Sequence, residues 1–488
     1  YIGIILYLLY IRLRLITSYS LDLDGAEFCY INFIQMLAQG TPLYRNPLEF
    51  PFMTVQHAPL YPYLLYYCFR LMHFDLINDI HKMMEVDRFI SWLSMFINLY
   101  FINKIFKKLG LSFFYFLTAV TFYVLLITGH FYATRQDSIK TTLFTIFFYN
   151  ILQFVFYNEG KKVMVFAILS GVVMVLFKQD SIIYLYLVLI SLCTYMQNKK
   201  VFRLSLWFTG CLLVSIITCY VIFGKYLFIN TVIFNIQVLT DTIHSFNILV
   251  VFFSVIRNFP LFVLAVAGSF YAIRNFKNKE VKYFLPLITV ICFFVAHISM
   301  FRAGSYLNYT YELILLLIVN AALLIREHEN YFRKHLKLFS AFMVFYIVSI
   351  GLTNRIIHSY TYDKDLEAAK KNDYYMELKE RDQIISLTNN ELVFLPNFKY
   401  VVFFVSTPFI WGYEMHFDRM LEVFLNYKTT SRLLFISTAK YDSYFTAGRV
   451  KYIITENNNI NDTHVRKYYP HYLPYKTYTK FRVYKYSS

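Results

Sequence analysis

Charged residues are scarce in this chain. They make up 16% of its 488 residues, whereas 58% are hydrophobic. Soluble domains average about 25% charged and about 45–50% apolar residues, so the composition excludes an ordinary water-soluble protein. Apolar runs of roughly 17–22 residues recur along the sequence, and a run of that length crosses a hydrocarbon layer of ~30 Å. The sequence therefore predicts a polytopic membrane protein.

Paired cysteines and nucleotide-binding motifs are also missing. The six cysteines include no CxxC pair, so neither a disulfide framework nor a cysteine metal site is indicated. The sequence has no GxxxxGK[ST], GxGxxG, HExxH or GxSxG motif. These absences argue against an ATP-driven enzyme or a nucleotide-sugar enzyme of the Rossmann type. They favour a donor that is charged elsewhere and delivered within the membrane.

The net charge of +17 lies largely in short loops after alternate predicted spans. The spans, about eleven in number, are residues 1–16, 88–104, 111–131, 138–157, 163–179, 181–197, 204–223, 258–274, 283–301, 311–326 and 337–353. The basic residues of those loops are Lys104, Lys107, Lys108, Lys161, Lys162, Lys199, Lys200, Arg203, Arg274, Lys277, Lys279, Lys282, Arg326, Arg333, Lys334 and Lys337. All fall on the cytoplasmic side if the first span runs outward, as the positive-inside rule predicts. The charge thus indicates topology in a membrane and not nucleic-acid binding.

The chain begins at Tyr1 with a short apolar run, so we expect a truncated first span, and no cleavable signal peptide is recognisable. The many Tyr, Phe, Ile, Asn and Lys residues favour an AT-rich bacterial genome. We expect the protein in a bacterial cytoplasmic membrane.

The opposite side of the membrane is predicted to carry a long first loop, residues 17–87. Apolar residues recur at helical spacing over 26–39 and stop before Gly40, which predicts a helix lying on the membrane surface. Residues 59–72 are apolar but short, which predicts a re-entrant or interfacial segment. A further interfacial helix is expected over 246–257.

The tail after residue 353 has a different composition. Residues 363–388 predict a charged helix, and residues 400–406, 433–437 and 450–454 predict buried strands. The predicted fold is an all-α polytopic membrane domain over 1–353, with a catalytic first loop, followed by a small extracytoplasmic α/β domain over 354–488.

Three acids stand at the start of the first loop: Asp22, Asp24 and Glu27. Carboxylates beside a hydrocarbon layer are costly unless they have a function. Asp24 and Glu27 are three residues apart, so they share a face if a helix begins there. A glycosyl transfer needs a base for the acceptor hydroxyl, and often a second carboxylate or a metal ion. The alternative is that Asp24 is a helix N-cap and Glu27 a first-turn acid.

Further polar groups are predicted at the same end of the spans. His57 lies in a loop stiffened by prolines, which would hold a ligand, a proton shuttle or an acceptor contact accurately, unless its role is structural. The other candidates, in turns between spans, are Arg135, Asp137, Lys178, Gln179, Arg302, Asn308 and Glu312. A phosphate group at this end would need such cations, although long basic side chains at span ends also snorkel.

Together these segments resemble the bacterial integral-membrane glycosyltransferases of the GT-C superfamily, in particular the group related to the aminoarabinose, protein mannosyl and dolichyl-phosphate-mannose-type transferases. The resemblance covers roughly residues 15–353. The motifs that carry it are Asp24 to Glu27, Gly40 to Tyr44, His57 to Pro62, Arg135 to Ser138, Lys178 with Gln179, and Gly304 to Glu312.

The resemblance implies an inverting transfer of a sugar from a polyprenyl-phosphate carrier to a lipid, glycan or protein acceptor at the outer face. It implies Asp24 as the base or acceptor-orienting acid, with Glu27 replacing or assisting it and Asp22 as third choice. Membrane lipids are expected partners, and nucleic acid is not.

The resemblance also implies where the carrier would bind. Lys178, Arg135 and Arg302 would hold its phosphate and stabilise the negative charge on the leaving group. Tyr61 belongs to the motif that begins at His57 and is counted with the substrate-binding residues. Some relatives use a divalent metal ion; the sequence has no dense ligand cluster, so we assign no metal or other cofactor.

Two other classes of protein compete with this interpretation. A transporter or flippase of a lipid-linked glycan is expected to have charged or broken helices near the bilayer midplane and internal repeats, and the sequence shows neither. A glycan polymerase or ligase is expected to carry its key basic residues in a large late outer loop, whereas here the acids come first.

Overall fold

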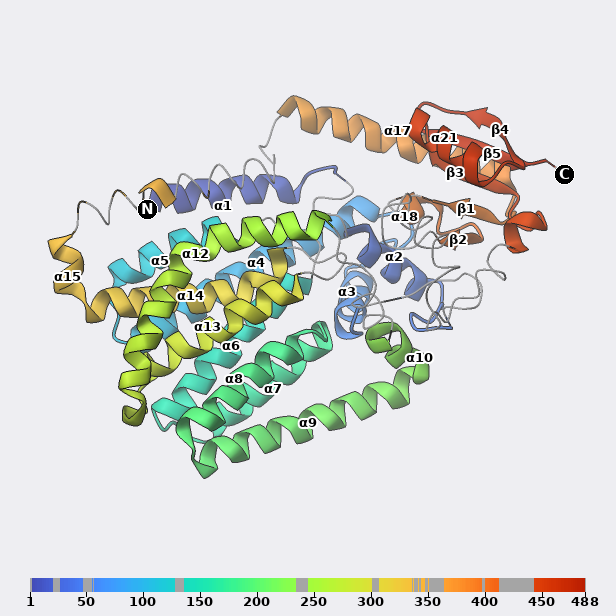
Figure 1. Cartoon of the computed structure of the whole chain (residues 1–488). Coiled ribbons are helices and arrows are strands. Elements are labelled where there is room, and N and C mark those ends of the chain that lie inside the picture. Colours follow the sequence, from blue (N-terminus) through green and yellow to red (C-terminus); the bar gives the residue numbers. More distant parts are fainter. Residues whose placement is uncertain are drawn as a thin grey trace.

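The structure is a computed structural model. It describes residues 2–20, 27–46, 55, 57–127, 136–233, 245–300, 307–335, 337, 341, 344–346, 350, 364–396, 400–411 and 443–487. A bundle of long helices fills most of the molecule, and a small C-terminal domain lies beyond one end of it (Figure 1).

Among the described residues, ten helices form the bundle. They are α1 (Ile2–Ile16), α4 (Ile80–Lys108), α5 (Phe113–Leu126), α6 (Gln136–Phe156), α7 (Lys161–Phe177), α8 (Ser181–Met196), α9 (Lys199–Phe223), α12 (Ser245–Arg274), α13 (Val281–Ser299) and α14 (Tyr311–Glu327). Five of them, α4, α6, α9, α12 and α13, are long and apolar enough to cross a membrane. All the predicted spans but the last coincide with one of these helices, and most of residues 337–353 lie outside the described residues. The chain is a multi-pass membrane protein.

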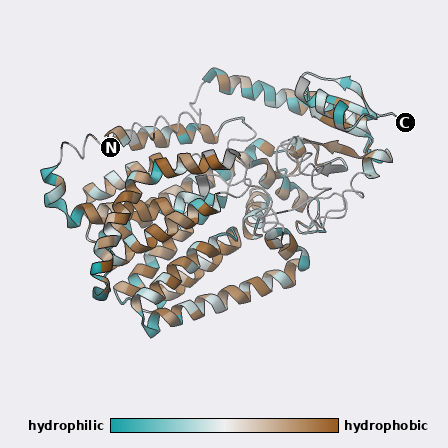
Figure 2. Ribbon diagram, in the orientation of Figure 1, coloured by the Kyte–Doolittle hydropathy of each residue, from teal (hydrophilic) through white to brown (hydrophobic). Residues whose placement is uncertain are grey.

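Burial separates the centre of the bundle from its rim. Every residue of α14 from Tyr311 to Leu323 is buried, as expected of a helix that is apolar all round. In α9 the buried residues are Val201, Leu204, Phe208 and Leu212, and large apolar side chains such as Trp207 face outward. The bundle is therefore hydrophobic on its outside as well as its inside, whereas the C-terminal domain is richer in hydrophilic residues (Figure 2).

The basic turns of the bundle meet at one end. The contacts that join them are Lys108 with Glu159 at 2.5 Å, Lys200 with Asn158 at 3.1 Å, Lys282 with Glu327 at 3.4 Å, and Arg326 with the carbonyl oxygen of Leu109 at 2.7 Å. Turns that the charge pattern assigns to one side thus share one end of the bundle. We call the opposite end, where α1, α7, α9 and α13 stop and α4, α6, α8 and α14 start, the polar end.

The predicted interfacial helix at the start of α12 is wrong. Residues 246–257 do not form a separate interfacial helix, because they are the first half of α12, which continues through Pro260 to Arg274. The apolar residues of the two halves are in phase, since Val250 and Leu261, three helical turns apart, are both buried.

A layer of short helices covers the polar end. It contains α2 (Glu27–Ala38), α3 (Leu60–Leu71), α10 (Lys225–Phe228) and the π-helical turn η2 (Ile229–Ile233). The predicted helix over 26–39 is present as α2, and it ends as expected at Gly40, which adopts a positive φ of 71°. The predicted segment over 59–72 is the short helix α3.

The prediction that α2 lies on the membrane surface is wrong. All its residues from Glu27 to Met36 are buried. The Gln35 side-chain amide donates to the carbonyl oxygen of Val402 at 2.9 Å, and that of Gln39 donates to Val405 at 2.9 Å. The C-terminal domain therefore covers α2, which explains why this helix has apolar residues on every side.

The C-terminal domain (residues 364–487) combines helices with one mixed sheet. Its elements are α17 (Lys364–Thr388), β1 (Val393–Leu395), α18 (Val401–Phe404), β2 (Phe409–Trp411), β3 (Tyr452–Glu456), α21 (Asn459–Tyr468), β4 (Tyr472–Thr477) and β5 (Phe481–Tyr486). The strand order is β2-β1-β3-β5-β4. β1 runs parallel to β2 and β3, with Val393 opposite Phe409 and Tyr452, and β5 pairs antiparallel with β3 and β4.

The α/β character of the tail and its long helix agree with the sequence, but the strands agree only in part. The strand expected over 450–454 is β3, two residues further on. The prediction of a strand over 400–406 is wrong, because Val401–Phe404 is the helix α18, which packs on α2. A short run of buried apolar residues suits a helical turn as well as a strand. Residues 433–437 lie outside the described residues. Short connecting elements are η3 (Phe276–Asn278), η4 (Leu307–Thr310) and α15 (Glu329–Lys334).

Candidate active site

A buried ion pair joins the start of α2 to α4. The Arg88 guanidinium donates from Nε to Oε1 of Glu27 at 2.8 Å and from Nη2 to Oε2 at 2.6 Å. Neither side chain is exposed, at 0% each. Such a two-pronged contact is the strongest geometry available to a guanidinium and a carboxylate. Glu27 is therefore engaged as a charge partner inside the protein.

The same guanidinium also holds the chain that leads into the acidic segment. Its Nη1 donates to the carbonyl oxygen of Ser18 at 2.6 Å, and its Nη2 to that of Ser20 at 2.6 Å. Arg88 thus contacts both flanks of residues 21–26, which contain Asp22 and Asp24. These two acids lie outside the described residues.

Next to Arg88, Asp87 accepts a hydrogen bond of 2.6 Å from the hydroxyl of Tyr61. Both residues are fully buried. Burial, together with the Asp87 carboxylate, raises the pKa of Tyr61 well above its usual value, so this hydroxyl stays protonated. The predicted substrate residue Tyr61 therefore has a partner within the protein and fixes α3 against α4.

The loop that carries His57 is held from several helices. The Nδ1 atom of His57 is 3.2 Å from the side-chain amide of Gln136 at the start of α6. The next amide, of Ala58, donates to Oε1 of Gln179 at 3.1 Å. The ring of Tyr30 on α2 lies 5.1 Å from the imidazole. The structure thus places the Gln179 side chain against the loop that carries His57.

Two further ion pairs follow where α6 faces α8 and α14. Lys178 contacts Asp137 at 2.6 Å and Asp180 at 3.7 Å, and it lies 5.0 Å from the ring of Tyr309. These groups are the predicted Asp137 and Lys178, together with the neighbouring acid of the FKQDS turn.

One helical turn further along α6, Lys140 contacts Glu312 of α14 at 3.0 Å, with side chains 1% and 0% exposed. Two ammonium and three carboxylate groups thus gather between α6, α8 and α14. The remaining predicted contacts, Arg135 and Arg302, lie outside the described residues. Asn308 lies in η4, and nothing is described of its side chain.

The sequence analysis missed Arg88 and Lys140 as members of this site. A usable signal was present, because both are ionisable residues within predicted apolar spans, and such residues commonly face the protein interior and have a function. Their partners were harder to find, since Glu27 is 61 positions from Arg88.

No group of three or more His, Cys, Asp or Glu side chains suited to a metal ion occurs among the described residues. Asp22 and Asp24 are not among the described residues. We assign no metal site. A cavity of about 610 Å³ lies elsewhere, on the C-terminal domain, and is lined by residues that include Lys451, Lys485 and Tyr486. It shares none of its residues with the ion pairs described above.

The helical bundle, with a small mixed sheet beyond its polar end, is the fold of a multi-pass membrane protein. The chain has the GT-C fold, which is shown by its likeness to solved structures. It is similar over 99% of its length to ArnT from Cupriavidus metallidurans in the apo state, with 97% of that chain covered, 11% sequence identity and a TM-score of 0.53. Against the structure of that protein bound to undecaprenyl phosphate the TM-score is 0.57, with 99% and 96% covered and 11% identity.

An archaeal protein has the same fold. The oligosaccharyltransferase of Archaeoglobus fulgidus, solved with a tethered acceptor peptide containing the NVT sequon, aligns with 93% of this chain and 69% of its own, at 11% identity and a TM-score of 0.51. No protein-family model matches the sequence, and no curated protein matches it either.

Proposed function

We propose that this protein is a glycosyltransferase that moves a sugar from a polyprenyl-phosphate carrier to an acceptor at the outer face of the cytoplasmic membrane, with inversion. The observation that carries the proposal is the Arg88 contact set, because one guanidinium holds both flanks of an acid-bearing segment at the polar end of a GT-C bundle. The similarity to a protein solved with undecaprenyl phosphate supports a carrier of this chemical class.

We assign the base to Asp24. Glu27 has both carboxylate oxygens on Arg88 and is not exposed, so a proton on it would break a buried ion pair. Asp24 lies in the sequence between the two points that Arg88 holds, and Asp22 is the second choice on the same segment. The base removes the proton of the acceptor hydroxyl as that oxygen bonds to the anomeric carbon.

The bond between the anomeric carbon and the phosphate oxygen breaks in the same step. The leaving polyprenyl phosphate changes from a diester to a monoester and gains negative charge, which nearby cations stabilise. We assign this role to Lys178, with Arg135 and Arg302. An ammonium has three N–H donors, so Lys178 can keep Asp137 at 2.6 Å and still donate to a phosphate oxygen.

The other predicted residues would bind the sugar or hold those that do. His57 lies in a loop that Gln179 contacts. An imidazole and an amide at this place could form hydrogen bonds with sugar hydroxyls. Asn308 would extend this surface. Glu312 pairs with Lys140 in the bundle, and Tyr61 supports the layer of short helices through Asp87.

The test is transfer of radiolabelled sugar from purified polyprenyl-phosphate donors by the reconstituted protein. Asp24→Asn should lower kcat by about 10²-fold or more and leave thermal unfolding unchanged. The matched control is Asp79→Asn, which changes an acid of the same loop that pairs with the exposed Lys82, and it should retain activity. If no donor is consumed by the folded wild-type protein, the proposal fails and a transporter or flippase of lipid-linked glycans takes its place.

A further inference from the structure

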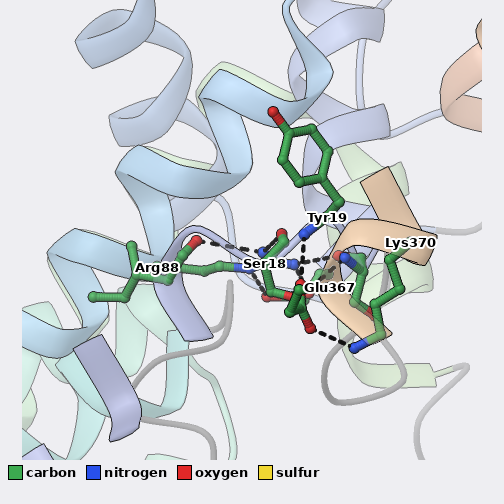
Figure 3. Close-up of polar contacts among 8 residues, drawn as sticks. Ser18, Tyr19, Arg88, Glu367 and Lys370 are labelled. Carbon is green, nitrogen blue, oxygen red and sulfur yellow. Dashed lines mark hydrogen bonds and ion pairs between the residues drawn. The ribbon is translucent and has the colours of Figure 1, made fainter. Parts of the chain in front are cut away.

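A second set of polar contacts reaches the acidic segment from the C-terminal domain. Ser18 lies between Arg88 and Glu367 of α17 (Figure 3). Its carbonyl oxygen accepts from Arg88 at 2.6 Å, and its hydroxyl donates to Oε2 of Glu367 at 2.8 Å. The amide of Tyr19 donates to the same oxygen at 3.3 Å. Lys370 contacts the other carboxylate oxygen at 2.7 Å.

The ring of Tyr19 strengthens this junction. It stacks on His81 of α4, with ring centroids 3.8 Å apart and planes 15° from parallel. Tyr374 and Lys371 of α17 approach it at 5.7 Å and 5.5 Å from its centroid. Tyr19 is therefore inserted between the bundle and α17, and Ser18 beside it is 1% exposed. The junction is therefore partly buried, and it differs from a fully exposed ion pair, which would contribute little.

We propose that Glu367 is a positioning residue that holds residues 18–20, the stretch that precedes the acids in the sequence, so that the C-terminal domain is a working part of the active site. This inference rests on the proposed function. Residues 18–20 are held by a cation from α4, through the carbonyl groups of Ser18 and Ser20, and by an anion from α17, through the Tyr19 amide and the Ser18 hydroxyl.

Contacts of opposite charge on the carbonyl and amide groups of one short stretch fix its rotation as well as its position. A displacement of a reacting group by ~1 Å can lower a rate by about 10²-fold, so a contact made 349 positions away in the sequence can affect kcat without touching substrate.

The test uses Glu367→Ala, Glu367→Gln and two controls on α17. The glutamine side chain keeps an oxygen that can accept from Ser18 and Tyr19, whereas alanine does not. Lys370→Ala removes only the partly exposed partner of Glu367. Glu380→Ala removes a carboxylate that accepts from the amides of Thr479 and Lys480, at 2.8 Å each, inside the C-terminal domain.

The first measurement is hydrogen–deuterium exchange of the Tyr19 and Ser20 amides in the reconstituted full chain. Glu367→Ala should speed exchange there by about tenfold or more, and Glu367→Gln and Lys370→Ala by less than about twofold. Glu380→Ala should speed exchange at residues 479–481 instead. Unchanged exchange at residues 19–20 in Glu367→Ala, or an equal change in Glu380→Ala, would overturn the inference.

The second measurement is steady-state transfer from the polyprenyl-phosphate sugar. Glu367→Ala should lower kcat by about tenfold, with KM for the donor within about twofold, and Glu367→Gln should restore most of the rate. Faster exchange with an unchanged kcat would overturn the positioning role. A folded wild-type protein that consumes no donor would overturn the proposed function instead, and the exchange data would then decide whether Glu367 holds residues 18–20.

Discussion

Removing one partner of the Glu27–Arg88 pair should destabilise the protein more than removing both charges. Both side chains are fully buried and joined by two hydrogen bonds of 2.8 and 2.6 Å. Glu27→Gln keeps an acceptor oxygen but leaves a buried guanidinium without its counter-charge, and breaking a buried pair in this way costs about 3–5 kcal/mol. Arg88→Met leaves a buried carboxylate and also frees the carbonyl groups of Ser18 and Ser20, each at about 1–3 kcal/mol.

The double variant Glu27→Gln/Arg88→Met removes both charges of the pair. The lost contacts to the carbonyl groups of Ile16, Ser18 and Ser20 and the altered packing remain. Its loss of unfolding free energy should therefore be smaller than the sum of the single losses by about 3 kcal/mol. The assay is SDS titration of the purified protein in mixed micelles, with the midpoint and slope measured for all four members of the cycle.

A matched cycle on Lys282 and Glu327 serves as the control. That pair joins two turns at 3.4 Å with side chains 27% and 31% exposed, so its coupling energy should be below about 1 kcal/mol. If the Glu27–Arg88 coupling is no larger than the control value, the pair does not hold the fold at this point. The argument that Glu27 is a structural charge partner and Asp24 the base would then be refuted.

Three further predictions concern side chains at the polar end of the bundle and in the layer of short helices that covers it. Lys178→Gln should lower kcat by about 10²-fold or more with a smaller change in donor KM, measured by steady-state kinetics, and an effect on KM alone would contradict its role at the leaving group. Lys140→Met should reduce the unfolding free energy by about 3–5 kcal/mol, because Glu312 loses its partner at 3.0 Å; adding Glu312→Leu should recover most of that loss in the same SDS titration. Gln35→Leu removes hydrogen bonds to Ile77 and Val402 and should speed hydrogen exchange across α18 by about tenfold, whereas no change there would show that Gln35 does not anchor the C-terminal domain.

Much of the bundle could be predicted from the sequence because its signals are long and repeated. Apolar length predicted most spans within a few residues, as for residues 138–157 and α6, although α4 and α12 begin well before the predicted spans 88–104 and 258–274. The alternation of basic loops predicted which turns share an end, and contacts such as Arg326 with Leu109 confirm that grouping. Both signals are sums over many residues, so local exceptions change them little.

Short and buried segments were predicted less well, for physical reasons. Val401–Phe404 carries no periodicity, because its side chains are all buried, so strand and helix are equally compatible with it. The α2 helix was expected at a membrane surface, and its cover is a domain more than 350 positions later in the chain. The hydrophobic pattern of a helix does not show whether lipid or a distant segment of the chain covers it.

The candidate site illustrates the same limit. The sequence listed candidate residues without partners, and the structure places Gln179 against the loop that carries His57 and pairs Lys178 with Asp137. The sequence alone could not show which residues contact one another, because the two members of each pair lie on different elements. The roles of Asp22, Asp24, Arg135 and Arg302 stay predictions.

The ion pairs at the polar end also connect stability to activity. Arg88 joins α4 to α2, Lys178 joins the α7–α8 turn to α6, and Lys140 joins α6 to α14. The charges that would serve the transfer are therefore the same groups that fix the helices around it, as expected where a reacting geometry must be held by its supporting residues. A loss of activity in this cluster identifies a catalytic role only when unfolding is measured on the same variant. Asp24→Asn is the informative change, because Glu27 and Arg88 keep their pairing in that variant and the acid alone is altered.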